Sequence, residues 1–177
     1  MAFLTVFASI AIGALFMSRY DHSIAPGNFW IKAASVGGLH PDVTDFQGFE
    51  RIERRVTGND ALVCPAELCR NLQDIDPPAY PVPASKLYGD IVAIALAEPR
   101  TVQLKSESAT STGSYKTELQ QVSALFRFPD LIAVEIIPRG PNFSTIALWS
   151  RSVVGRKDFG VNRARVERWL KRLPVGN

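Results

Sequence analysis

The sequence contains few of the residues that most enzymes use at a reaction centre. Its 177 residues include only two cysteines and two histidines, and both histidines, His22 and His40, lie near the N-terminus. The nucleophile elbow Gly-x-Ser-x-Gly does not occur, and the C-terminal half has no histidine to serve as the base of a serine or cysteine nucleophile. We therefore expect a non-catalytic protein without a cofactor or a metal site.

Two motifs resemble phosphate chemistry but lack the residues that perform it. Gly155 and Gly160 have the spacing of a phosphate-binding loop, but Val161 and Asn162 replace the lysine and the hydroxyl residue that hold phosphate and magnesium. The triplet Asp158–Gly160 is the DFG of protein kinases, yet the chain is far too short for a kinase and has none of the other kinase motifs. Neither motif indicates a phosphoryl-transfer enzyme.

The first residues contain no charge over an apolar run. Ala2 to Met17 spans roughly 24 Å as a helix, slightly less than a hydrocarbon core of about 30 Å. No basic residue precedes the run, and the only weak cleavage signal is Ala11–Gly13, which disfavours a cleaved secretory signal. We expect residues 1–20 to form an uncleaved single-pass anchor; a cleaved signal and a buried helix are the alternatives.

The two cysteines bear on the compartment of the domain. Cys64 and Cys69 are five positions apart around Pro65, a spacing that permits a disulfide. Unpaired thiols are the alternative, while a structural zinc site would need four ligands. Because disulfides persist in oxidising compartments, we expect a protein of the cell inner membrane with a periplasmic domain, although Arg19 after the apolar run favours a cytoplasmic one.

Residues 21–83 are rich in proline and glycine and lack a long regular pattern. Prolines at 77, 78, 81 and 83 preclude a continuous helix near the end of this segment. Aromatic side chains such as Phe46 and Tyr80 indicate that parts of it pack on something. We interpret it as an irregular linker that packs on the core domain or on a partner.

Regular patterns begin at residue 84 and continue to residue 177. Ser85 is expected to cap a helix of about thirteen residues that ends before Pro99, and a second amphipathic helix is expected over about Asn162 to Leu173. Four β-rich runs separated by short turns lie between them. The sequence predicts an α+β fold in two layers: a helix, a four-stranded antiparallel meander and a C-terminal helix, with both helices on one face of the sheet.

Two segments of this core resemble a known family. LFRFPDLIAVEI, followed by SRSVVGRKDFGVNRARVERWLKRL, resembles the signature of the domain of unknown function 1499 family over about Lys86 to Leu173. That family often has a Cys-Pro pair upstream, to which CPAELC is similar with different spacing. The resemblance implies a small bacterial or organellar protein, often with an N-terminal hydrophobic segment, and it implies no established activity.

The segment between the last strand and the last helix has two interpretations. As a structural corner, Gly155 and Gly160 permit tight turns, and Asp158 or Asn162 caps the helix. In this interpretation Arg165 pairs with Asp158 or with Asp130. As a binding site, arginines converge on the positive end of the helix. The candidate ligand-binding residues are Arg127, Asp130, Arg151, Arg156, Asp158, Asn162 and Arg163.

Two functions of different classes follow. The first is an accessory or assembly protein that docks on a larger membrane complex or envelope assembly through its anchor, its linker and its sheet. The second is a binding module for a small anionic or amphiphilic, lipid-like ligand at the arginine-rich corner. The cations of the last helix suit a solvated face or anionic lipid better than nucleic acid, which we do not expect as a partner.

Overall fold

The computed structural model of the chain describes residues 46–54, 58–107, 110–124, 128–155 and 157–174. The predicted anchor at 1–20 and the first part of the predicted linker lie outside these residues. Among the helices of the described part, none is long and apolar enough to cross a membrane.

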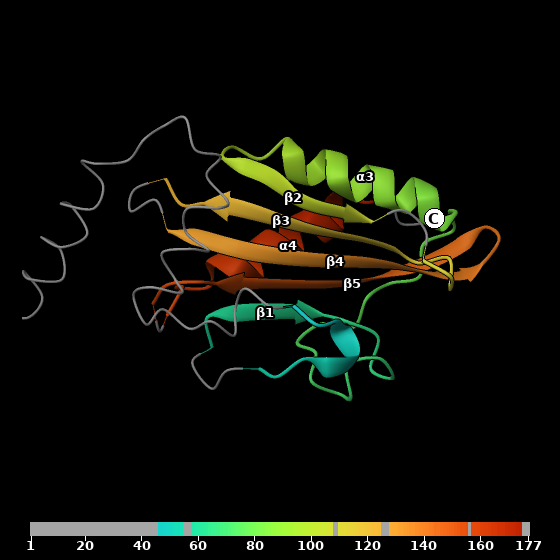
Figure 1. Cartoon of the computed structure of the whole chain (residues 1–177), viewed down its shortest axis with the longest axis horizontal. Helices are drawn as coiled ribbons and strands as arrows, with labels where there is room; N and C mark the ends of the chain where they lie inside the picture. The colour runs from blue at the N-terminus through green and yellow to red at the C-terminus, as the bar shows by residue number, and fades with distance from the viewer. Residues whose placement is uncertain (1–45, 55–57, 108–109, 125–127, 156, 175–177) are drawn as a thin grey trace, which may run out of the picture.

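The described residues form an α+β domain with two α-helices and one five-stranded sheet (Figure 1). All strand pairs are antiparallel, and the order across the sheet is β1-β5-β4-β3-β2. In chain order, a short 3-10 helix and the regular elements are η2 (Phe49–Arg51), β1 (Asp60–Val63), α3 (Ala84–Leu96), β2 (Thr101–Glu107), β3 (Tyr115–Val122), β4 (Pro129–Gly140), β5 (Phe143–Ser152) and α4 (Val161–Arg172).

The predicted meander is present as β2 to β5, but the prediction of four strands is wrong by one. Strand β1 lies in the segment that we expected to be irregular, and it pairs with β5 along Asp60–Val63. Its four residues are too few to show an alternating pattern, so its strand state depends on the pairing partner. The same segment also pairs with β5 through Tyr80, whose backbone N–H and C=O both bind Ser144.

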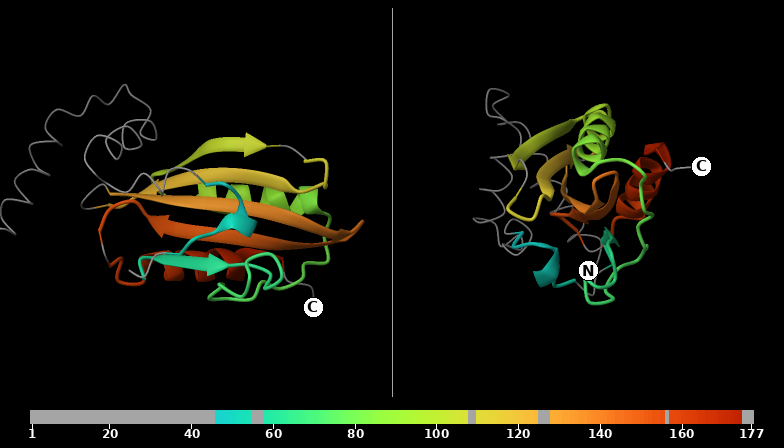
Figure 2. Two further views of the ribbon diagram at one scale, coloured as in Figure 1. Left: turned by 60° about the horizontal axis from the view of Figure 1, so that its bottom comes forward. Right: turned by 90° about the vertical axis from the view of Figure 1, so that its right-hand side faces the viewer.

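Both helices lie on one face of the sheet, as predicted (Figure 2). Leu87, Ile91 and Ala95 of α3 recur at helical spacing and are fully buried against the strands. They join apolar side chains of β3, β4 and β5, together with Val166 and Trp169 of α4, in the main core. This face of the sheet is therefore closed by its two helices.

The start of α3 differs from the prediction. Ser85 is the second residue of the helix, and Pro83 stands at the N-cap without a side-chain cap. The carbonyl of Pro83 accepts hydrogen bonds from the N–H groups of Lys86 and Leu87. The helix therefore begins two residues earlier than a serine cap at position 85 would place it.

The opposite face of the sheet carries a smaller apolar cluster. Phe49 packs there with Leu62, Ala147 and Trp149, and the predicted Cys64–Cys69 disulfide adjoins them with a Cα–Cα distance of 6.1 Å. Arg54 binds both Asp60 and Asp74 by ion pairs of 3.0 and 2.8 Å and so ties the outer edge of β1 to the following loop. The disulfide and these ion pairs connect β1 to the loop that follows it, and they stabilise the position of this short strand at the sheet edge.

Helix α4 should depend on Trp169 for its attachment to the sheet, because this side chain is fully buried beside Val166 and Leu173. We expect Trp169→Ala to lower the free energy of unfolding by about 3–5 kcal/mol, as for other buried aromatics. Lys171→Ala, at an exposed position of the same helix, should change it by less than about 0.5 kcal/mol. Denaturant unfolding of both variants measures the difference, and equal stabilities would show that α4 is not part of the core.

Candidate functional site: a buried polar network beneath α4

A single buried arginine organises the corner between β5 and α4. The side chain of Arg165 is only 3% exposed. Its Nη2 donates to Asp130 Oδ2 at 2.6 Å, its Nε to Gln121 Oε1 at 2.7 Å, and its Nη1 to Ser150 Oγ and Asn162 Oδ1 at 2.7 Å each. Each nitrogen of the guanidinium group therefore has an acceptor, which is the condition under which a buried ion pair is tolerated.

Asn162 links this arginine to the rest of the corner. Its side chain is fully buried, and its Nδ2 lies 2.8 Å from Asp158 Oδ2, 2.9 Å from Ser152 Oγ and 3.0 Å from the carbonyl oxygen of Asn59. Ser152 in turn donates to Asp130 Oδ1 at 2.8 Å, which closes a ring of hydrogen bonds back to Arg165. The amide thus joins α4 to β5 and to the residue that precedes β1.

Asp158 caps the helix from three residues before its first residue, Val161. Its carboxylate accepts the backbone N–H of Gly160 at 3.0 Å and that of Asn162 at 2.8 Å. Gly160 has a positive φ of 80°, and Phe159 beside it has a φ of 55°. The carboxylate satisfies N–H groups that a helix start leaves without a partner, and it fixes this left-handed turn.

The structure brings only some of the predicted binding residues together. Asp130, Asp158 and Asn162 meet in the buried network, whereas Arg151 lies on the opposite face of the sheet, 4.4 Å from the ring centroid of Trp149. Arg163 points outward, is half exposed, and pairs with Glu167 one turn further along α4. Arg127 and Arg156 lie outside the described residues.

The candidate residues taken from the sequence did not include four members of the network: Asn59, Gln121, Ser150 and Ser152. The period-two rule already places Ser150 and Ser152 on one face of β5 and Arg151 on the other. In the same way, Gln121 shares the helix-facing side of β3 with the buried Leu119. Gln121 could have been found from the sequence, because it is a polar residue among apolar neighbours on the strand face that the helices cover. No pattern in the turn before β1 indicated Asn59.

An ion pair at the protein surface adjoins the network. Arg168 of α4 holds Glu98, which follows α3, through two hydrogen bonds of 2.8 Å, and Gln121 Nε2 approaches the same carboxylate at 3.5 Å. The hydrogen bonds from Arg168 lower the pKa of Glu98 to about 2, against the desolvation that opposes them. This contact ties the end of α3 to the side of α4.

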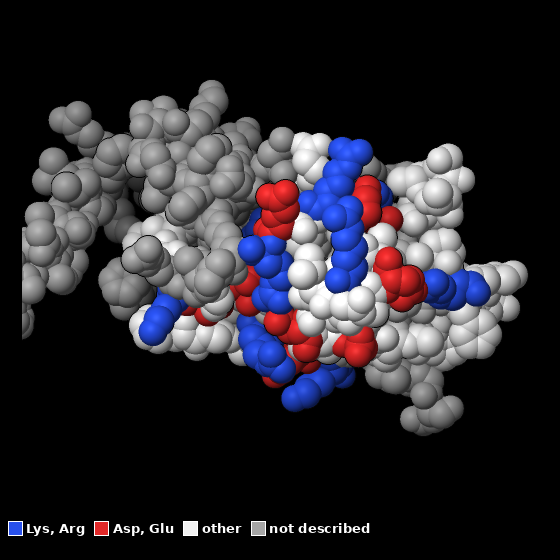
Figure 3. Space-filling model, turned by 90° about the horizontal axis from the view of Figure 1, so that it is seen from below, with Lys and Arg blue, Asp and Glu red and all other residues white. Residues whose placement is uncertain are grey.

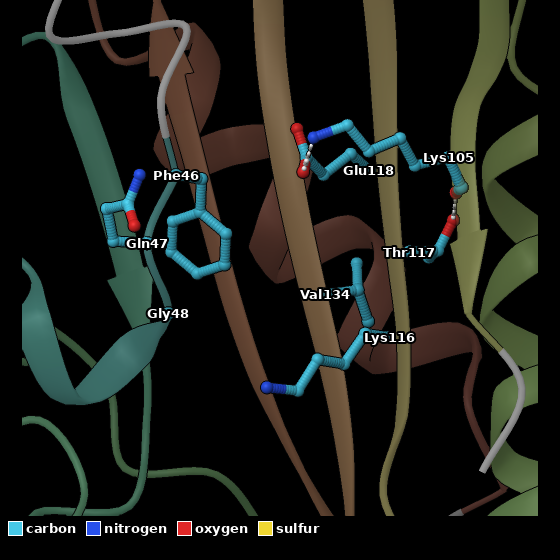
Figure 4. Close-up of a pocket in the computed structure, with 8 residues that line it drawn as sticks. All are labelled: Phe46, Gln47, Gly48, Lys105, Lys116, Thr117, Glu118 and Val134. Atoms are coloured by element: carbon cyan, nitrogen blue, oxygen red, sulfur yellow. Dashed lines mark hydrogen bonds and ion pairs between the residues drawn. The ribbon is translucent and has the colours of Figure 1, made fainter. Parts of the chain in front are cut away.

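A pocket lies on the opposite face of the sheet, away from the network (Figure 4). It has a volume of about 200 Å³ and is bounded on one side by Phe46–Gly48 and on the other by side chains of β2 and β3. Lys105 crosses from β2 to Glu118 of β3 at 2.9 Å along its rim. The pocket therefore combines an aromatic wall with charges of both signs.

Among the described residues, no three His, Cys, Asp or Glu side chains are grouped in a way that could hold a metal ion. A family model described as "Protein of unknown function (DUF1499)" matches residues 51–173. No curated protein and no solved structure matches the chain. The matched range includes the whole buried network.

Breaking the buried pair should destabilise the domain strongly. Asp130→Asn and Arg165→Met each leave an unpaired charge or donor set beneath α4, so we expect each to lower the free energy of unfolding by about 3–5 kcal/mol. The matched control is Arg163→Met on the exposed side of the same helix, which should change it by less than about 1 kcal/mol. Chemical denaturation gives the values; near-wild-type stability of both buried variants would contradict the role assigned to the network.

The contact between Glu98 and Arg168 should make stability depend on pH in the acid range. Since the folded pKa of Glu98 lies at about 2, below its ordinary value of 4.5, the contribution is complete above about pH 4.5 and is lost as pH falls toward 2. We expect Glu98→Gln to lower stability at pH 7 by about 1–2 kcal/mol and to flatten this part of the profile. Thermal unfolding from pH 7 to pH 2 tests it, and parallel wild-type and variant profiles would refute it.

Proposed function

The chain belongs to the DUF1499 family, and from that premise we propose that it is a non-catalytic, membrane-anchored accessory protein whose α+β domain docks on a larger membrane complex or envelope assembly. The observation that supports this proposal most is that the motif residues bind one another. Asp130, Asn162 and Arg165 direct their polar groups into the domain, where they hold α4 on the sheet. These residues stabilise the fold, and we therefore assign partner binding to a different surface of the domain.

The alternative, a small anionic ligand at the arginine-rich corner, has less support from the geometry. Arg151 and Arg163 lie on different sides of the domain, one under the sheet and one on the outer surface of α4. Among the arginines that the structure describes, Arg165 reaches the corner, and its donors are engaged by side chains of the domain. A ligand there would have to displace Asp130 from a buried pair.

The face of the sheet opposite the helices is the surface that we assign to docking. We call it the docking face and define it by Phe46, Lys105, Lys116 and Glu118; Trp149 lies beside Phe46 and is itself buried. Its two lysines are matched by acids on neighbouring strands, Lys105 by Glu118 at 2.9 Å and Lys116 by Glu135 at 3.5 Å. Aromatic side chains beside balanced charges are typical of protein–protein interfaces, where hot spots are aromatic and rims are polar.

Charge elsewhere on the domain is also mixed in sign. Figure 3 views the molecule from the β1 side and shows lysine and arginine side chains interleaved with aspartate and glutamate. Among the described residues, Arg54 pairs with two aspartates and Arg139 pairs with Glu67. The face seen in Figure 3 has no extended positive patch, which favours a protein partner over a polyanion such as nucleic acid at that face.

The Cys64–Cys69 disulfide supports placing the domain outside the cytoplasm. Together with the apolar run at Ala2–Met17, it favours an inner-membrane protein with a periplasmic domain.

Co-purification of the full chain from native membranes in mild detergent, followed by mass spectrometry of proteins and lipids, tests the proposal. We expect a defined set of membrane proteins with the wild type and at least a tenfold loss of them with Lys105→Glu, because the reversed charge faces Glu118 on the docking face.

The matched control is Lys171→Glu, an exposed charge reversal on α4, which should retain the partners. Equal recovery with both variants would place the interface elsewhere. Recovery of a stoichiometric small molecule without any protein would favour the ligand-binding alternative and contradict the accessory function.

A further inference from the structure

An apolar side chain projects from the domain where β5 leads into α4. Phe159 is 96% exposed and Val161, at the start of α4, is 50% exposed. Phe128, 39% exposed, precedes β4 in the adjacent loop, which is held alongside by the pairing of Asp130 with Ser152. We call Phe128, Phe159 and Val161 the apolar tip.

Hydrogen bonds within the domain fix the backbone conformation of the apolar tip at Phe159. Phe159 has a φ of 55°, a left-handed value that is unusual for a bulky side chain. The carboxylate of Asp158 imposes it by binding the N–H groups of Gly160 and Asn162, and Asn162 is anchored in the network of Arg165. At 96% exposure, the side chain of Phe159 is almost uncovered by the described residues, so the strained turn holds a large apolar group out into the surroundings.

Cations flank these apolar side chains. Lys157 precedes them and is exposed, and the side chain of Arg163, one turn into α4, is 57% exposed. Asp158 is engaged by backbone N–H groups, and the pair of Arg163 with Glu167 at 2.9 Å is an exposed one, weak enough for Arg163 to exchange this partner for a phosphate. An aromatic side chain with lysine and arginine beside it matches the chemistry of the interface between acyl chains and anionic headgroups.

We propose that the apolar tip inserts into the interfacial region of a membrane that carries anionic lipids, with Phe159 at the level of the acyl boundary and Lys157 and Arg163 at headgroup phosphates. A membrane fits better than a protein pocket because the membrane anchor of the proposed function, on which this step rests, would keep the tip near one. Only residues 18–45 separate the apolar run at Ala2–Met17 from Phe46, a tether of roughly 95 Å at full extension.

This contact uses a different surface from the docking face and would orient that face relative to the bilayer. A bilayer-bound tip and a tethered N-terminus restrain the domain at two points, so only some of its orientations remain. Loss of partner binding on the docking face would therefore leave the membrane contact of the tip intact, and the two proposals fail separately.

Quenching by lipids with brominated acyl chains tests the insertion. The full chain is reconstituted into phosphatidylcholine vesicles with about 30 mol % phosphatidylglycerol, once as Phe159→Trp and once as Phe143→Trp. Phe143 is the matched control: it is also an exposed phenylalanine, but it opens β5 at the opposite end of the sheet (Figure 2). The native tryptophans contribute the same background to both variants.

We expect the brominated lipid to quench the added tryptophan at 159 at least about twofold more than that at 143, and more strongly with phosphatidylglycerol than without it. Equal quenching at the two positions would overturn the proposal. A benzophenone amino acid at 159, activated in native membranes, provides a second readout: lipid adducts support insertion, whereas adducts with a protein alone would overturn it.

Discussion

The ion pair between Arg165 and Asp130 is the constraint on which the domain depends. A buried guanidinium must be neutralised and given acceptors for its hydrogen bonds, since an unpaired charge in the interior is strongly destabilising. Its acceptors come from β3, β4, β5 and α4 itself. A register slip of one residue in any of these strands would turn its acceptor to the other face, so the pair also selects the register of the sheet.

This constraint divides the domain into two unlike faces. On the helix side, the polar network and the main core leave little that a partner could reach. On the other side, Trp149, Arg151 and the cross-strand pairs of Lys105 and Lys116 stand on the same strands, one residue out of phase with the network. The residues that resemble a family signature therefore hold the scaffold, and the surfaces they position are where binding is proposed.

Most of the regular elements were accessible from local pattern. The amphipathic spacing of residues 84–96 and the four β-rich runs placed α3 and strands β2 to β5 close to where they occur, because periodicity within one element needs no partner. The C-terminal helix followed from Val166 and Trp169 in the same way. Strand β1 did not, because four residues carry no period and its strand state comes from β5.

The sequence by itself determined the α+β class and the apolar face of each helix. It also reduced the state of the two cysteines to a disulfide or unpaired thiols, and the partner of Arg165 to Asp130 or Asp158. Only the tertiary structure decided that Asp130, rather than Asp158, neutralises Arg165, and that Asn59 meets Asn162 across 103 positions of chain. The physical reason is that strand alternation and helical spacing assign each residue to one face of its own element. Strand order and register then decide which residues from distant parts of the chain lie side by side on that face.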